Sequence, residues 1–500
     1  MKQINSVGRG FRFSLALVVM LAVSLLLAAC GSDSPTTLSL SNNPTTAAAS
    51  TTSASGATTA ATATSNSLPA TTAASNISAT TVTPNTTTSA TGSGTPLAVP
   101  TVNVPQSVQQ EMDKIAKQTE QTRRLTFKQP VERNFMTRND LAKYQEEQFR
   151  KDNPPEEIAK TEKMLKVFGF VPQNFDLTRT YIDLLSEQIL GFYDPETKKL
   201  YIVVDGDPNK VDPLVKFTAE HELTHGLQDQ YFNLQKFQAQ RKPSDTEWND
   251  DQDTAKLALI EGDAVTSQTI WLPNLSQSEL QQMSQAISSF DSSQLQKAPL
   301  ILSESLNFPY TAGATFVGQL YRKGGWDAVN KAFTDYAPKS TSQILHPDKY
   351  TNKVEPVKVQ FSSLTGTLGN GWKSLDINTM GEFQTRVWLQ GGVDQKTATD
   401  AATGWTGDRY QVLENAQGQN GYTWRSQWEN QTEASQFYNT SVTALKKIYN
   451  LSGDGTGTNQ KRTWSTSSQD ISITQKDNEV LITLLPKGTG VDKIASKLGF

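Results

Sequence analysis

Apolar residues that recur every three or four positions predict a mostly helical folded part that begins near residue 105. Helices are expected over 105–124, 138–169, 180–190, 212–230, 254–271, 277–286 and 312–323. Between the third and the fourth, the segment 191–204 alternates as two short strands around a turn at Asp194–Thr197. This alternation is typical of a β-hairpin.

Proline, aspartate and glycine mark several helix ends. Pro154–Pro155 interrupts the second helical stretch and begins a new helix there. Asp212 and Pro213 form a strong start signal, with aspartate at the N-cap and proline in the first turn. Gly324–Gly325 is expected to end the last helix of this part.

Beyond about residue 374, short helical and strand-like patterns alternate, so the fold class is α+β with a C-terminal α+β accessory region at 374–500. The segments are 410–413, 422–428, 433–449, 471–474, 480–485 and 492–498. Trp405, Trp424 and Trp428 lie close together in this region. Core packing is the favoured reason for them, and a ligand platform is the alternative.

The first 29 residues read as an export signal. A basic start is followed by an apolar run that stops at Leu27-Ala28-Ala29-Cys30. This tetrapeptide resembles the lipobox of bacterial lipoproteins, in which the cysteine is acylated. Cys30 is the only cysteine of the chain, which excludes internal disulfides. We expect lipid attachment at Cys30 and an extracytoplasmic location, with an uncleaved signal anchor as the alternative.

Residues 30–104 have the composition of a disordered linker. Ser, Thr and Ala make up 48 of the 74 residues from 31 to 104, and Asp33 is the only charged residue among them. Such a stretch buries too little apolar surface to offset the entropy lost on ordering. The net charge of the whole chain is −4, without a basic cluster, so a nucleic-acid partner is not expected.

The strongest chemical signal is His221-Glu222-Leu223-Thr224-His225, inside the predicted helix 212–230. Residues i and i+4 share one helix face, so both imidazoles can bind one Zn²⁺. Glu222 follows the first ligand, where it can act as general base toward a zinc-bound water, whose pKa zinc lowers to about 7. Two of the chain's three histidines lie in this motif.

A catalytic zinc takes a third protein ligand. Glu261 is the favoured candidate, because it lies on the next predicted helix in an otherwise apolar stretch. A carboxylate on the buried side of a helix is strongly disfavoured unless it is paired or bound to metal. Asp253 and Asp263 are weaker candidates, and a glutamate on the helix surface is the alternative reading of Glu261.

The segment His221–His225, followed by Asp229, resembles the thermolysin-type helix of the gluzincin metallopeptidases. Glu261-Gly-x-Ala is similar to the aminopeptidase branch of that clan. The resemblance implies a zincin-type metallopeptidase domain at 105–373, with Glu261 as third ligand. It also implies that Asp229 or Asp263 orients a histidine ligand from outside the metal's coordination sphere. The chain departs from the pattern in a longer gap before Glu261, and in Val265, where thermolysin-type sequences have an aspartate.

Such peptidases also use a donor for the developing oxyanion, typically a histidine or tyrosine downstream of the ligands. His346 and Tyr310 are the candidates here, with a surface histidine and a core tyrosine as their alternatives. An edge strand before the metal helix usually binds the peptide by strand addition, and the hairpin 191–204 stands at the corresponding place in the chain.

These features predict a membrane-anchored, extracytoplasmic zinc metallopeptidase with one Zn²⁺ per chain and a peptide or protein substrate. One alternative is a non-catalytic lipoprotein that binds peptides or wall polymer and keeps a structural metal site. Another is a zinc hydrolase that acts on a different bond, such as a peptidoglycan amide. Glu222 argues for catalysis, because a binding protein has no need of a general base there.

Overall fold

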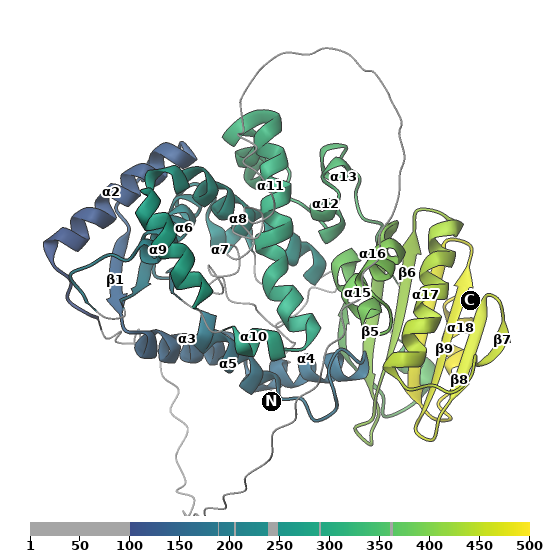
Figure 1. Cartoon of the computed structure of the whole chain (residues 1–500). Helices are drawn as coiled ribbons and strands as arrows, with labels where there is room; N and C mark the ends of the chain where they lie inside the picture. Colours follow the sequence, from purple (N-terminus) through teal and green to yellow (C-terminus); the bar gives the residue numbers. More distant parts are fainter. Residues whose placement is uncertain (1–100, 189, 205–206, 239–248, 290–291, 361–363) are drawn as a thin grey trace, which may run out of the picture. The chain divides into compact units, whose positions relative to one another are not determined.

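The computed structural model describes residues 101–188, 190–204, 207–238, 249–289, 292–360 and 364–500. Helices and strands are mixed throughout these residues, which confirms the α+β class (Figure 1). The export signal, Cys30 and nearly all of the linker lie outside them. Within the described ranges, no helix has both the length and the apolar character needed to cross a membrane.

The first part of the fold, up to residue 360, is mainly helical. Its helices are α2 (Gln106–Arg123), α3 (Arg138–Asp152), α4 (Pro155–Val167), α5 (Leu177–Gln188), α6 (Pro213–Phe232), α7 (Leu234–Phe237), α8 (Asp250–Trp271), α9 (Gln277–Ser288), α10 (Ser293–Lys297), α11 (Leu300–Thr334), α12 (Thr341–Leu345) and α13 (Pro347–Thr351), with a 3-10 turn, η1 (Leu272–Asn274). The break predicted at Pro154–Pro155 is confirmed, since α4 begins at Pro155.

A small sheet with the order β1-β3-β2 accompanies these helices. β2 (Gly191–Asp194) and β3 (Lys199–Val203) pair antiparallel, which confirms the predicted hairpin. β1 (Glu132–Met136), which the sequence pattern did not predict, pairs with β3 in parallel. β2 is therefore an edge strand of this sheet.

Helix α6 is the central element of this part. The Asp212 side chain accepts a hydrogen bond from the Leu214 N–H at 2.8 Å, and Pro213 opens the helix, as predicted. Every residue from Phe217 to Asp229 is buried, because α2, α8, β2 and β3 all pack against the helix. A helix covered on all sides must satisfy its polar side chains internally.

Helices α8 and α11 cross backbone against backbone. A Cβ on Gly262 would lie 2.2 Å from the carbonyl carbon of Gly313, and a Cβ on Gly313 would lie 2.2 Å from the Ala258 oxygen. Only glycine fits at both positions of this crossing. The prediction of a helix over 312–323 was too short, since α11 starts at Leu300 and continues through an internal Pro309. Its backbone does leave helical geometry at Gly324–Gly325, where an end was predicted.

The C-terminal part is an antiparallel sheet covered by helices (Figure 1). The strand order is β4-β5-β6-β10-β9-β8-β7. The strands are β4 (Lys373–Asn378), β5 (Trp405–Glu414), β6 (Asn420–Trp428), β7 (Thr456–Thr458), β8 (Lys461–Ser465), β9 (Gln469–Lys476) and β10 (Glu479–Pro486). The helices are α14 (Thr365–Leu368), α15 (Gly381–Gln390), α16 (Gln395–Ala402), α17 (Gln431–Ile448) and α18 (Val491–Lys497).

The three tryptophans of this region belong to its hydrophobic core. Trp405, Trp424 and Trp428 are each at most 2% exposed, and Trp428 stacks on Phe437 of α17 with ring centroids 4.4 Å apart. The prediction that they serve core packing is confirmed.

Residues that follow α4 also enter this C-terminal core. The Phe168 ring stacks on Tyr422 with a centroid distance of 3.9 Å, and the Trp388 indole N–H donates to the Phe168 carbonyl at 3.0 Å. The hydrophobic packing therefore continues across the predicted boundary at 373–374.

Candidate metal centre

The structure brings His221, His225 and Glu261 together. His221 Nε2 lies 3.2 Å and His225 Nε2 lies 3.4 Å from the same oxygen, Glu261 Oε2. All three side chains are 1% exposed, and among the described residues they form the one cluster whose ligand atoms suit a metal ion. Asp253, the weaker candidate, lies two helical turns before Glu261 and does not join the cluster.

The distances from the two histidine nitrogens to the glutamate oxygen fit zinc. Two ligands that each lie about 2.0–2.1 Å from a tetrahedral centre are about 3.3 Å apart. The two nitrogen–oxygen distances, 3.2 and 3.4 Å, bracket that value. Two imidazoles and one carboxylate also form a donor set that zinc prefers at catalytic sites.

Reciprocal glutamine contacts hold α6 and α8 in register. Gln228 of α6 donates to the Ile260 carbonyl of α8 at 2.9 Å, and Gln268 of α8 donates to the Phe217 carbonyl of α6 at 2.9 Å. Because each bond ties a side chain to the other helix's backbone, the two helices cannot slide past each other without losing both. This register sets the two histidines opposite Glu261.

The same two glutamines lie beside the two histidines. His225 Nδ1 is 2.8 Å from Gln228 Oε1, so its other ring nitrogen, Nε2, faces Glu261. Burial lowers the pKa of His221 below its ordinary value, and the contacts with Glu261 and the nearby Gln268 oppose this shift only in part. His221 Nδ1 is buried without a well-formed hydrogen bond.

Asp263 lies on the side of Gln228 that faces away from the His225 ring. Its Oδ2 accepts a hydrogen bond from Gln228 Nε2 at 2.8 Å, and its Oδ1 forms an ion pair with Arg123 Nε at 2.8 Å. Asp263 therefore reaches His225 only through Gln228, and the expectation that it orients a histidine ligand from outside the coordination sphere stays a prediction.

Asp229 has a different position from the one that the gluzincin resemblance implied. Its carboxylate accepts from the Tyr193 hydroxyl at 2.9 Å, from Lys198 Nζ at 2.6 Å and from the Leu234 N–H at 3.0 Å. These partners correct the expectation that Asp229 orients a histidine ligand. It anchors the hairpin to the end of α6.

Glu222 lies against the edge strand β2. Its Oε2 accepts a hydrogen bond from the Tyr193 N–H at 2.7 Å, and its side chain is buried. Asp229 holds the ring of the same tyrosine, so it positions the backbone N–H that contacts Glu222.

The charges of the cluster shift one another's pKa values. Burial raises the pKa of Glu222 to about 8. Burial also opposes a charge on Glu261, but the facing His225 and His221 outweigh it and lower the pKa of Glu261 to about 2. Burial opposes a charge on His225 as well, and Glu261 reverses this and raises the pKa of His225 to about 9. A divalent cation bound here would take the place of the ring proton as partner of Glu261, because ligating histidines are neutral.

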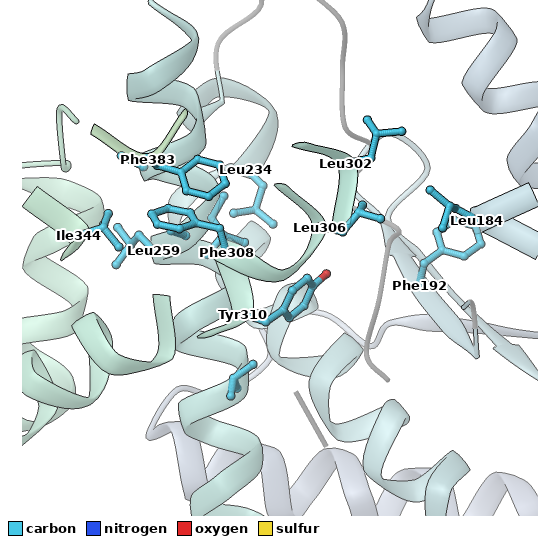
Figure 2. Close-up of a cluster of buried hydrophobic side chains, with 14 of the residues drawn as sticks. Leu184, Phe192, Leu234, Leu259, Leu302, Leu306, Phe308, Tyr310, Ile344 and Phe383 are labelled. Carbon is cyan, nitrogen blue, oxygen red and sulfur yellow. The ribbon is translucent and has the colours of Figure 1, made fainter. Parts of the chain in front are cut away.

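Tyr310 of α11 completes the group. Its ring stacks beside His221 with centroids 6.1 Å apart and an interplanar angle of 28°. Burial, together with the nearby Glu261 and Glu222, raises the pKa of Tyr310 well above its ordinary value, so the hydroxyl keeps its proton. Figure 2 shows Tyr310 on α11 beside Leu306, in the buried cluster that also includes Phe192 of β2. The Gly262–Gly313 crossing explains its place, because Gly313 lies one turn after Tyr310 and Gly262 follows Glu261.

His346 does not join the cluster. It lies between α12 and α13, and its Nε2 is 2.6 Å from Glu382 Oε1 of α15. That contact raises the pKa of His346, and the other charges that act on it are Lys349 and Asp348. The expectation that His346 is an oxyanion donor is therefore corrected, and the same role for Tyr310 stays a prediction.

Comparison with known proteins bears on the C-terminal part. A family model described as a domain of unknown function (DUF8575) matches residues 372–495. Searches of curated proteins and of solved structures found no match. The matched segment contains the whole seven-stranded sheet and helices α15 to α17, so the metal cluster lies outside it.

Sequence reasoning missed Gln228 and Arg123. Gln228 stands three residues after His225, on the same helix face, so helical periodicity alone contained the signal for it. Arg123 lies 140 residues before Asp263, and no local pattern indicates that the two meet.

Proposed function

We propose that the protein is an extracytoplasmic, membrane-anchored zinc-dependent peptidase of the zincin type, with one Zn²⁺ per chain held by His221, His225 and Glu261. The observation that carries the proposal is that the two histidine nitrogens lie 3.2 and 3.4 Å from one glutamate oxygen, in a cluster of three buried side chains. Membrane anchoring rests on the lipobox resemblance around Cys30.

Zinc bound there would polarise the scissile carbonyl and lower the pKa of an attacking water. Glu222 is the proposed general base. Because the Tyr193 N–H occupies Oε2, we assign the proton-accepting role to the other carboxylate oxygen, Oε1. Tyr310 keeps its proton and lies beside His221, so its hydroxyl is the proposed donor to the oxyanion.

The edge strand β2 supports a peptide substrate. It pairs with β3 on one side only, and on the other side the Tyr193 N–H is directed at Glu222. A substrate in extended conformation that adds to this edge would bring its backbone to the proposed base.

Metal analysis and peptide digestion with the purified full chain test the proposal. We expect close to one zinc per chain, and most of it should be lost in His221→Ala. Glu222→Gln should keep the zinc and lose cleavage by about 10²–10⁴-fold, because an amide does not accept the proton. His346→Ala is the matched control, since it removes the third histidine of the chain and should change neither quantity.

The outcomes separate the proposal from its alternatives. A zinc-loaded parent that cleaves no peptide in a broad library would favour a structural metal site. Cleavage of peptidoglycan fragments but not of peptides would move the substrate to the cell wall. Full zinc retention in both His221→Ala and His225→Ala would contradict the ligand assignment itself.

A further inference from the structure

Behind His225 lies a line of fully buried polar side chains. Gln228 Oε1 is 2.8 Å from His225 Nδ1, and the amide nitrogen of Gln228 donates to Asp263 Oδ2 at 2.8 Å and to the Ile260 carbonyl at 2.9 Å. Gln228 and Asp263 are each 0% exposed.

These contacts fix the orientation of the Gln228 amide. If it were reversed, its oxygen would face the Asp263 and Ile260 oxygens, and its nitrogen would face the ring. In the observed orientation an acceptor faces Nδ1 of His225, so that nitrogen must carry the proton and donate. In the neutral ring, which is the form that binds a metal, the lone pair then belongs to Nε2, which lies 3.4 Å from Glu261 Oε2.

Arg123 supports Asp263 from the far side. The guanidinium contacts both carboxylate oxygens, Nε to Oδ1 at 2.8 Å and Nη2 to Oδ2 at 3.1 Å, and it is itself 0% exposed. It lies over the Trp326 ring, 4.3 Å from the centroid, and donates to Asn330 Oδ1 at 2.7 Å. A buried carboxylate without a cation is strongly disfavoured, so Arg123 allows Asp263 to serve as the anionic acceptor for Gln228.

We propose that Gln228, Asp263 and Arg123 are positioning residues that hold His225 in its metal-binding tautomer and orientation. The inference rests on the proposed function, because it concerns the same metal centre. The inference assigns the direct contact with the His225 ring to Gln228, which is not a metal ligand. Because Arg123 lies at the end of α2, the inference also makes α2 part of the site. Outer partners of metal-ligating histidines commonly contribute ten- to a hundredfold in affinity.

Zinc affinity of the purified full chain, measured by competition with a chelator, tests the proposal. Gln228→Leu preserves volume but removes both hydrogen-bonding functions, and it should weaken zinc binding by about ten- to a hundredfold. Gln145→Leu is the matched control. It removes another buried glutamine, 2% exposed, which lies on α3 and whose Nε2 has no hydrogen-bond partner. Its zinc affinity should equal that of the parent.

A rescue experiment separates positioning from packing. Gln228→Glu keeps an acceptor for His225 but repels Asp263, so it should weaken zinc binding. Asp263→Asn alone should also weaken zinc binding, because it removes the carboxylate that accepts from Gln228. In the double variant, the amide introduced at position 263 can donate to the carboxylate introduced at position 228. The double variant should therefore bind zinc more tightly than the two single losses predict together.

A second readout uses the scarcity of histidine. Labelling with ¹⁵N-histidine gives only three imidazoles, and in the zinc-loaded parent His225 should show a proton on Nδ1 that exchanges slowly with solvent. In Gln228→Leu that proton should exchange faster. If Gln228→Leu folds, binds zinc within twofold of the parent and leaves this exchange unchanged, the positioning role is wrong. A parent that binds no zinc would instead overturn the proposed function and this inference with it.

Discussion

The crossing of α8 and α11 at Gly262 and Gly313 leads to a prediction about both stability and activity. In Gly262→Ala the new methyl group would lie 2.2 Å from the carbonyl carbon and oxygen of Gly313, and 2.8 Å from the Ala314 nitrogen. These are backbone atoms, so no side-chain rotation relieves the contact. Ordinary contacts begin at 3.4 Å, and the two helices must therefore separate locally by about 1.2 Å, the difference between 3.4 and 2.2 Å.

The magnitude follows from two opposing terms. Overpacking of a well-packed interior costs about 1–3 kcal/mol, and a backbone clash belongs at the upper end of that range. Alanine gains about 1 kcal/mol over glycine as a helix former. We therefore expect the free energy of unfolding to fall by about 2 kcal/mol. Glu261 is adjacent to the crossing and Tyr310 lies one turn from it, and a displacement of about 1 Å at reacting groups costs about 10²-fold in rate.

Urea unfolding followed by tryptophan fluorescence, together with kcat/KM on a cleaved peptide, measures both effects. Gly318→Ala is the matched control. It lies in the same helix α11, and the nearest atom to its Cβ would be the flexible Arg322 Nη1 at 3.6 Å. This control should be neutral or stabilised by up to about 1 kcal/mol. If Gly262→Ala is as stable and as active as Gly318→Ala, the account of the crossing is wrong.

Three further predictions concern the ligand set, pH and the anchor. Glu261→Ala should lower zinc affinity by orders of magnitude and Asp253→Ala should not. Competition with a chelator measures both affinities, and a larger loss in Asp253→Ala would mean that Asp253 is the third ligand instead of Glu261. Burial raises the pKa of Asp251 from 3.8 to about 8, so the stability that its proton contributes is complete below the lower value and is lost as pH rises toward the higher one. Asp251→Asn should therefore flatten the fall in unfolding free energy between about pH 4 and about pH 8, and an unchanged slope would refute this. Cys30→Ala should abolish labelling of the protein by a fatty-acid analogue in cells, and equal labelling would contradict lipid attachment.

Local signals in the sequence were sufficient for most helices and for the hairpin. Asp212 and Pro213 start α6, and a helix cap of this kind depends only on neighbouring residues. The turn after Asp194 likewise depends only on the backbone conformation of its own few residues. The start of α11 was missed, because Pro309 reads as a helix breaker and only tertiary packing keeps the helix continuous through it. β1 was missed for a related reason, since it forms by parallel pairing with a strand more than sixty residues later.

The candidate site divides in the same way. The spacing of His221, Glu222 and His225 is a property of one helix, so the sequence contained it in full. Glu261 was reached by a burial argument about the next helix, and the structure places it opposite the histidines. The roles expected for Asp229 and His346 needed knowledge of contacts across the fold, and both residues have other partners, Tyr193 and Glu382.

The connections around Arg123 indicate how much of the chain the metal centre requires. Arg123 ends α2, the first helix of the described residues, and it contacts Asp263 of α8 and Asn330 of α11. Trp326 of α11 adds a second link, because its indole N–H donates to the Thr122 carbonyl at 2.7 Å. The helices that Arg123 joins are thus the ones that carry Glu261 and Tyr310. The smallest unit able to hold the proposed centre therefore runs at least from α2 to the end of α11. Helix α2 is part of that unit although the chain reaches it directly after the predicted linker.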